Sequence, residues 1–215
     1  MFTGLIERIC SVRSVSRQAG TAGSSVIIDL GEIANECKCG DSIAINGACL
    51  TIARLEGSLA SFDISPETLK KSTLGRLTAS SEVNIERAIK PTDRFGGHFV
   101  LGHVDGTATI KAIERQNDFA RWTFAAGPEL LEGMVTKGSV AVNGISLTIA
   151  HLDHTGFSVA IIPETLERTT LNKANIGDSV NIEIDIIVKS VKRQLEEILP
   201  KKQSLTAERL RELGF

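Results

Sequence analysis

The chain of 215 residues has no surplus of one charge and no long apolar run. Its 24 Lys and Arg residues nearly balance 26 Asp and Glu residues, for a net charge of −2, which argues against nucleic acid or an anionic membrane as a general partner. No stretch approaches the roughly 18 apolar residues of a membrane span. Glu7 and Arg8 stand where a signal peptide needs apolar residues, so we expect a cytoplasmic protein.

Cysteine is scarce and confined to the first quarter of the chain, at Cys10, Cys37, Cys39 and Cys49. This spacing is not a disulfide framework. The C-x-C at 37–39 is not accompanied by a second ligand pair with zinc-like spacing, so we interpret it as incidental.

Common catalytic signatures are also missing. The sequence contains no G-x-x-x-x-G-K-[ST], G-x-G-x-x-G or G-x-S-x-G, which argues against a phosphate-binding loop, a dinucleotide-binding fold and a hydrolase elbow.

The chain does contain a tandem repeat. When the sequence is shifted by 97 residues, 42–86 aligns with 139–183 without a gap, and 21 of the 45 positions are identical. "NGACLTIA" at 46–53 returns as "NGISLTIA" at 143–150. Nearer the start the shift becomes 98, so that "TGLIE" at 3–7 aligns with "LGHVD" at 101–105. Two copies indicate two similar domains that arose by duplication.

Each copy is predicted to be mainly β. Short β-branched, apolar stretches lie between Gly and Asn breaks and predict a small closed barrel. The expected strand segments are 25–30, 42–55, 58–64, 83–89, 108–113, 121–126, 139–152, 157–162 and 180–188. Asn-Gly at 46–47 and 143–144 is the clearest turn signal.

Few helices are expected. "PETL" at 66–69 and 163–166 and "GPELLEGM" at 127–134 predict short ones. In 185–200 an apolar stripe at helical spacing predicts a longer helix that Pro200 ends, and a second helix is expected at 206–213. The stripe consists of Val188, Val191, Leu195 and Ile198. It either packs on its own domain or forms a subunit contact, because a lone helix of this length is marginal in water.

The residues that follow the two Asn-Gly turns are candidates for chemistry. Strand alternation puts Cys49 with Thr51 on one face, and Ser146 with Thr148 on the equivalent face of the second copy. That face is either barrel core or the wall of a ligand pocket. Two related pockets with different reactive groups are expected if the same molecule is bound twice and the two bound copies react with each other.

Other candidates break the repeat. His103 aligns with Leu5 and suits proton transfer near neutral pH. Lys137 aligns with Gly40 and is either solvated or holds a polar group. The H-x4-H spacing of His98 and His103 does not favour a shared metal ion.

"MFTGLIE", "NGACLT", "GGHFVLGHVD", "NGISLT", "IPETLERTTL" and "VNIEID" together resemble riboflavin synthase of the trimeric α-subunit type, over about residues 1–190. The resemblance implies two tandem homologous six-stranded Greek-key β-barrels plus a carboxy-terminal α-helix. We expect barrel domains at 1–97 and 98–186 and a helical tail at 187–215 that makes the trimer contact.

The resemblance also implies the reaction. Two molecules of 6,7-dimethyl-8-ribityllumazine exchange a four-carbon unit and give riboflavin and 5-amino-6-ribitylamino-uracil, with no redox cofactor and no metal. It implies a homotrimer whose active site lies between the first barrel of one subunit and the second barrel of its neighbour. Association with lumazine synthase is a further expectation.

The site residues carried over from the family fall into two sets. The first-barrel pocket is expected to use Gly4, Leu5, Ile6, Ala48, Cys49, Leu50, Thr51, Asp63, Ile64, Ser65, Pro66, Glu67 and Thr68, with Phe2 and Thr3 near the rings. The second-barrel pocket is expected to use Gly102, His103, Val104, Lys137, Ser146, Leu147, Thr148, Ile161, Ile162, Pro163, Glu164, Thr165 and Leu166. His103, Ser146 and Thr148 are expected to handle proton transfer and polarisation, and Cys49 is either a nucleophile or a lining residue.

Two other functions are considered. Lumazine proteins are non-catalytic carriers similar to this family, and binding of one ligand per chain would distinguish a carrier from an enzyme that binds two. A flavin-binding barrel of the ferredoxin-reductase type would need a nucleotide-binding α/β domain, whereas this chain repeats the barrel instead.

Overall fold

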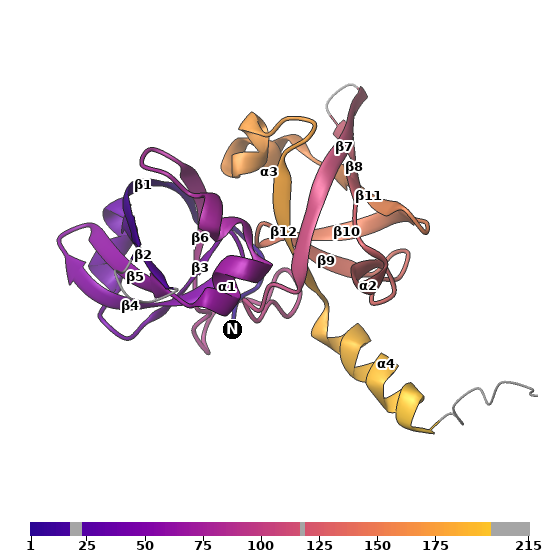
Figure 1. Cartoon of the computed structure of the whole chain (residues 1–215), viewed down its shortest axis with the longest axis horizontal. Coiled ribbons are helices and arrows are strands. Elements are labelled where there is room, and N and C mark those ends of the chain that lie inside the picture. Colours follow the sequence, from indigo (N-terminus) through magenta and orange to yellow (C-terminus); the bar gives the residue numbers. More distant parts are fainter. Residues whose placement is uncertain (18–22, 117–118, 199–215) are drawn as a thin grey trace, which may run out of the picture.

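The chain forms two closed β-barrels of six antiparallel strands each and a carboxy-terminal helix (Figure 1). The computed structural model describes residues 1–17, 23–116 and 119–198. The barrels lie inside the predicted domains 1–97 and 98–186, whose limits stay a prediction. The fold class expected from the sequence is confirmed.

The two barrels have the same strand order. In the first, the order around the barrel is β1-β2-β5-β4-β3-β6, and the second repeats it as β7-β8-β11-β10-β9-β12. Because β2 pairs with β5 and not with β3, each barrel contains the return connection of a Greek key. The strands are β1 (Arg8–Arg17), β2 (Ser24–Asp29), β3 (Ser42–Ile45), β4 (Ala48–Glu56), β5 (Leu59–Ile64), β6 (Glu82–Arg87), β7 (Gly106–Gln116), β8 (Phe119–Ala125), β9 (Ser139–Val142), β10 (Ile145–Leu152), β11 (Gly156–Ile161) and β12 (Ser179–Ile184).

Short helices follow β5 and β11 in both repeats. The predicted "PETL" helices are α1 (Pro66–Lys71) and α3 (Pro163–Arg168), each with proline in its first turn, and α2 is Pro128–Leu131. The 3₁₀ helices are η1 (Gly31–Glu36), η2 (Thr73–Arg76) and η3 (Thr170–Lys173). The tail helix is α4 (Ile186–Ile198).

Two sequence expectations differ from the structure. Strand β1, "RICSVRSVSR", is not among the expected strands, because the alternation that places Cys10 and Val12 inward is short and a bulge after Val12 interrupts it. Residues 186–188, counted in both a strand and a helix, are helical, since β12 ends at Ile184. The helix expected at 206–213 lies outside the described residues.

Both Asn-Gly turns adopt the conformation that their sequence predicts. Asn46 and Gly47 have φ of 46° and 79°, and Asn143 and Gly144 have 47° and 78°, as two-residue hairpin turns require. The two turns meet at the junction between the barrels, where a Cβ atom on Gly47 would lie 2.6 Å from the Gly144 nitrogen. Glycine is therefore needed there for close approach as well as for φ.

Four asparagines join the barrels around these turns. Asn84 on β6 donates from Nδ2 to the Asn143 carbonyl at 3.0 Å, and its repeat equivalent Asn181 donates to the Asn46 carbonyl at 2.8 Å. The side-chain carbonyls of Asn84 and Asn181 accept from the backbone N–H groups of Thr170 and Thr73 in the opposite barrel. The junction is thus held by hydrogen bonds related by an approximate two-fold axis.

The amino-terminal segment packs between the barrels and not on one of them. Phe2 is fully buried, exchanges two backbone hydrogen bonds with Val100, and forms a small apolar cluster with Ala44 of β3 and Ala141 of β9. Each barrel has its own separate core.

Helix α4 extends beyond both barrels (Figure 1), and most of its apolar stripe is not covered by its own chain. The exposed fractions are 53% for Val191, 49% for Leu195 and 74% for Ile198, while Val188 is half-buried. Packing of the whole stripe on its own domain, one of the two expectations, is therefore wrong for the described chain. Among the described residues no helix has the length and apolar character needed to cross a membrane.

Replacing Asn84 by Ala should lower the free energy of unfolding by about 2–4 kcal/mol, because two partly buried backbone partners in the opposite barrel, the Asn143 carbonyl and the Thr170 N–H, lose their hydrogen bonds. Urea unfolding followed by the fluorescence of Trp122, the only tryptophan, measures the free energy of unfolding. Trp122 lies in the second barrel, so it reports whether a substitution in the first barrel destabilises the second. Asn172→Ala, at an exposed position, should change stability by less than about 0.5 kcal/mol. Equal effects of the two variants would contradict the role of the asparagine junction.

Candidate functional site

Cys49 and Ser146 occupy equivalent places beside the junction. Each is the second residue of its strand, β4 or β10, and each is half-buried on the outer side of its barrel. Thr51 and Thr148 lie further along the same faces and are exposed. The core position considered for Cys49 is therefore wrong, and both reactive side chains belong to an outer wall.

Each of these residues is contacted by the segment that precedes a barrel's first strand. The Cys49 N–H donates to the Gly102 carbonyl at 2.9 Å, and the Ser146 N–H donates to the Gly4 carbonyl at 2.8 Å. Gly4 and Gly102 have φ of 80° and 82°, and a side chain at either would collide with Ser146 or Cys49. Gly4 and Gly102 are equivalent in the repeat, so both walls are built in the same way.

The leading segments cross to the opposite barrel. Gly4 precedes the first barrel but lies against Ser146 of the second, where Ile6 also packs on the second core. Gly102 precedes the second barrel but lies against Cys49 of the first, where Val104 packs on the first core. The predicted grouping is therefore wrong: Gly4, Leu5 and Ile6 belong with Ser146, and Gly102, His103 and Val104 belong with Cys49.

We define the N-site as the pocket of about 330 Å³ beside Cys49. His103 reaches it from the crossing segment and Thr68 from helix α1. The complete lining consists of Ala48, Cys49, Glu67, Thr68, Lys71, Gly102, His103, Val104 and Asp105. A thiol, an imidazole, a hydroxyl and charged groups of both signs thus surround one space.

We define the C-site as the equivalent wall formed by Ser146, Thr148, the segment Gly4–Ile6 and helix α3. Its chemistry differs because Leu5 stands where the N-site has His103. The polar partner of Ser146 is instead His98, whose Nδ1 lies 2.7 Å from the serine Oγ. Burial lowers the pKa of His98, while the charge of Asp185 opposes this shift. His98 is 7% exposed, and no described residue is a hydrogen-bond partner of its Nε2.

Two buried glutamates hold the crossing segments. Glu86 on β6 accepts hydrogen bonds from the Thr3 N–H at 2.6 Å and the Gly4 N–H at 3.0 Å, and Glu183 on β12 accepts from the Leu101 and Gly102 N–H groups at 2.6 and 2.9 Å. Burial raises the pKa of both carboxyls, against the effect of these donors. The donors compensate part of the cost of burying a carboxylate.

Comparison with known proteins identifies the repeats. The model of the lumazine binding domain matches residues 3–88 and again 101–185. Riboflavin synthase of Bacillus subtilis (strain 168) is 41% identical, with all of both chains covered. Riboflavin synthase of Escherichia coli (strain K12) is 35% identical, with 95% of this chain and 96% of that protein covered.

The chain belongs to the riboflavin synthase family.

A solved structure of LumP in complex with 6,7-dimethyl-8-(1'-D-ribityl) lumazine has the same fold as this family member. Its TM-score is 0.77 at 21% identity, with 85% of this chain and 98% of that chain covered. At this identity the likeness concerns the fold alone.

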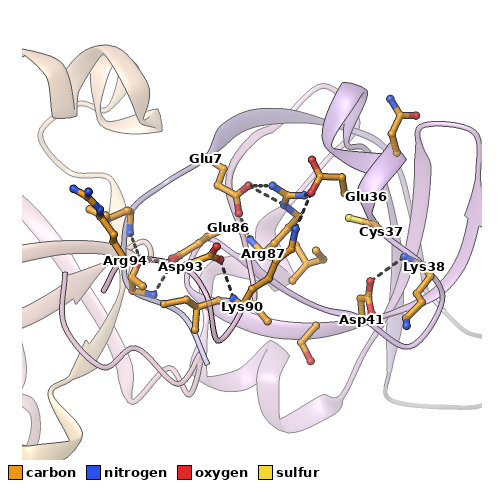
Figure 2. Close-up of a pocket in the computed structure, with 17 residues that line it drawn as sticks. Glu7, Glu36, Cys37, Lys38, Asp41, Glu86, Arg87, Lys90, Asp93 and Arg94 are labelled. Carbon is orange, nitrogen blue, oxygen red and sulfur yellow. Dashed lines mark hydrogen bonds and ion pairs between the residues drawn. The ribbon is translucent and has the colours of Figure 1, made fainter. Parts of the chain in front are cut away.

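A larger pocket, of about 720 Å³, lies beside Leu5 between β3, β6, η1 and the inter-barrel linker (Figure 2). Arg87 binds both Glu7 and Glu36 in it, with its Nη1 3.1 Å from Glu36 and its Nη2 2.7 Å from Glu7, and Lys90 lies 2.9 Å from Glu36. The hydrogen bond that Arg87 donates to the Glu7 carboxylate raises the pKa of Arg87. Charged side chains of both signs therefore line this pocket, and these four pair with one another.

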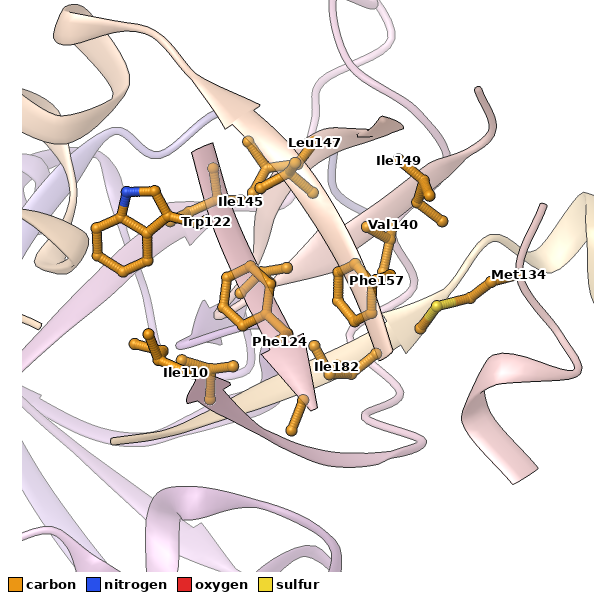
Figure 3. Packing of buried hydrophobic residues seen from close by; sticks show 14 of the residues in the cluster. Ile110, Trp122, Phe124, Met134, Val140, Ile145, Leu147, Ile149, Phe157 and Ile182 are labelled. Carbon is orange, nitrogen blue, oxygen red and sulfur yellow. The ribbon is translucent and has the colours of Figure 1, made fainter. Parts of the chain in front are cut away.

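Several predicted site residues place their side chains in the barrel cores. Leu147 packs in the second core beside Ile145 (Figure 3). The same core contains the stacked rings of Phe124 and Phe157, whose centroids are 5.1 Å apart. The other predicted site residues with core side chains are Ala48, Leu50, Ile64 and Ile161. Lys137 is exposed and has φ of 69° where its counterpart Gly40 has 93°, so the repeat keeps the backbone shape but not the residue.

Sequence reasoning missed His98 as a site residue. It lies in the linker and has no counterpart in the first repeat, so the comparison of copies gave no signal. Only the crossing of the segment 2–4, whose Thr3 carbonyl accepts from the His98 N–H, brings the imidazole to Ser146.

The contribution of His98 to protein stability should become unfavourable as the pH is lowered below about 6.5. The folded pKa of His98 lies below its ordinary value of 6.5, so protonation favours the unfolded chain and the penalty grows as pH decreases through that value. Urea unfolding at pH 7.5 and 5.5 should show a smaller loss for His98→Asn than for the unmodified chain. His154→Asn, at an exposed position, should behave as the unmodified chain does. An unchanged loss in His98→Asn would contradict the assignment.

Proposed function

We propose that this protein catalyses the riboflavin synthase reaction, the last step of riboflavin biosynthesis. Two molecules of 6,7-dimethyl-8-ribityllumazine exchange a four-carbon unit and give riboflavin and 5-amino-6-ribitylamino-uracil. The observation that carries the proposal is the match, over essentially the full chain, to curated riboflavin synthases. Both lumazine binding domains are matched, as a reaction between two copies of one substrate requires.

The reaction needs groups that transfer protons and a site that positions the two substrates. The two products together contain the atoms of two substrate molecules, so no external oxidant or reductant enters the balance. The C7 methyl group of one lumazine loses a proton, because the resulting anion is delocalised over the ring. The other lumazine becomes an electrophile when a nucleophile adds to its ring. Holding two rings face to face contributes up to about 7–11 kcal/mol at the favourable limit.

The two sites supply different groups for these steps. At the N-site, His103 is positioned for proton transfer, and Cys49 either adds to the ring as a nucleophile or lines the pocket. At the C-site, Ser146 and Thr148 provide hydroxyls, with His98 hydrogen-bonded to Ser146. Identical substrates thus meet different chemical groups, which is what assigns one as donor and the other as acceptor of the four-carbon unit.

We further propose a homotrimer held by helix α4, with the N-site of one subunit facing the C-site of its neighbour. The exposed stripe of Val191, Leu195 and Ile198 supports this arrangement, because an apolar helix face of this size is stable only when covered. A cytoplasmic location and association with lumazine synthase stay predictions from the family resemblance.

Non-catalytic binding is the second candidate function, since the LumP structures share the fold. The curated riboflavin synthases are more similar in sequence, so the enzyme is favoured.

Purified protein given 6,7-dimethyl-8-ribityllumazine, a chelator and no cofactor should form riboflavin continuously at half a mole per mole of substrate, measured by its absorbance. Calorimetric titration with a non-reacting lumazine analogue should give two sites per chain. Tight binding at one site per chain without product would contradict the synthase proposal and favour the carrier.

Val191→Glu should dissociate the oligomer, because it places a charge in the proposed contact. Light scattering after gel filtration measures the mass, and the unmodified protein is expected at three chains. Arg193→Glu puts the same charge on the opposite side of the helix and should leave the oligomer intact. If Val191→Glu also runs as a trimer, or the unmodified protein is a monomer, the α4 contact is wrong.

A further inference from the structure

Helix α4 is tied to the crossing segment that builds the N-site. The Lys189 ammonium lies 2.9 and 2.8 Å from the two carboxylate oxygens of Asp105. Asp105 itself lines the N-site and ends the segment Gly102–Asp105 that carries His103. Both side chains of this pair are about one-quarter to one-third exposed, at 26% for Asp105 and 30% for Lys189.

Asp105 is also fixed to strand β12. Its Oδ2 accepts from the Ile184 N–H at 2.8 Å, and its own N–H donates to the Ile182 carbonyl at 2.9 Å. The segment is therefore held at one end by Glu183, through Leu101 and Gly102, and at the other end by Asp105. Lys189 is the cation that neutralises and orients the second of these anchors.

The first repeat has the same anchor with a different source of positive charge. Glu7 is the counterpart of Asp105, and its Oε1 accepts from the Arg87 N–H at 2.6 Å. The guanidinium of Arg87 also binds Glu7, with its Nε 2.8 Å from the Glu7 Oε2. In the second repeat the counterpart of Arg87 is Ile184, whose side chain is uncharged. The cation comes instead from the helix that follows the strand.

We propose that Lys189 of helix α4 is a positioning residue for the N-site. It holds the segment Gly102–Asp105 against Cys49 through Asp105, so that the placement of His103 depends on the helix. The C-site does not share this dependence, since its crossing segment is anchored by Glu7 and Arg87 within the first barrel. A helix proposed for subunit contact thereby acts on one of the two sites and not on the other.

Hydrogen exchange at two equivalent amides tests the proposal. The Cys49 N–H reports closure of the N-site, because its acceptor is the Gly102 carbonyl, and the Ser146 N–H reports the C-site through the Gly4 carbonyl. In Lys189→Met, exchange at Cys49 should accelerate by about threefold to fivefold, as expected for loss of one partly exposed ion pair. Exchange at Ser146 should stay unchanged, and Lys189→Arg should restore the slow exchange at Cys49. Residue-resolved mass spectrometry on the full chain provides both values.

Lys192→Met is the matched control, because Lys192 lies on the same helix and pairs with Glu132. It should alter neither amide. Should Lys189→Met fail to fold, Asp105→Asn removes the same ion pair and should also accelerate exchange at Cys49 alone. Unchanged exchange at Cys49, or equal acceleration at Cys49 and Ser146, would overturn the proposal.

The catalytic consequence of this inference rests on the proposed function. Lys189→Met should raise KM for 6,7-dimethyl-8-ribityllumazine by about threefold to fivefold while light scattering shows the same oligomer as the unmodified protein. If the unmodified protein forms no riboflavin, the proposed function fails, but the exchange rates of Cys49 and Ser146 still decide the role of Lys189.

Discussion

The exchange of leading segments between the two barrels is the constraint on which the rest of the structure depends. Each segment leaves its own barrel, is held by a buried glutamate, Glu86 or Glu183, and presents a glycine carbonyl to the reactive wall of the other barrel. A buried carboxylate is costly unless several donors satisfy it, and here the donors are backbone N–H groups of the crossing segment itself. Each wall therefore combines residues of both repeats.

The comparison of the two repeats separates residues that build the junction from residues that define the chemistry. Three pairs of junction residues are identical in the two repeats: Asn46 and Asn143, Gly47 and Gly144, and Glu86 and Glu183. The Asn46 and Asn143 carbonyls accept hydrogen bonds from the opposite barrel, the two glycines lie in close contact, and the two glutamates accept from the crossing segments. The side chains that face the sites differ, as with Cys49 and Ser146 or His103 and Leu5. The two repeats thus keep the same backbone arrangement around Cys49 and Ser146, while substitutions on the two walls make them chemically unequal.

Much of the fold follows from the sequence because it depends on local signals. The Asn-Gly turns require positive φ, the "PETL" segments place proline in a first helical turn, and "VNIE" at 83–86 and 180–183 lies in the equivalent strands β6 and β12. The membership of each site was predicted incorrectly for a physical reason. The internal repeat shows that Gly4 and Gly102 are equivalent positions. It does not show whether each leading segment packs on its own barrel or crosses to the other, because both arrangements give the same repeat in the sequence. The burial of His98 against Ser146 is a consequence of that crossing, and therefore it also escaped prediction.

The two sites differ in how their crossing segments are anchored as well as in their chemical groups. The anchor of the C-site is internal to the first barrel, since Arg87 provides both the N–H and the positive charge that Glu7 requires. At the N-site, two elements provide these groups to Asp105: strand β12 provides the N–H of Ile184, and helix α4 provides the positive charge of Lys189. Helix α4 therefore contacts the anchor Asp105 through Lys189, whereas the anchor Glu7 is bound by Arg87 of strand β6. Under the proposed function both sites bind the same molecule, and the proposed role of Lys189 then makes the placement of one substrate depend on the helix and the placement of the other independent of it.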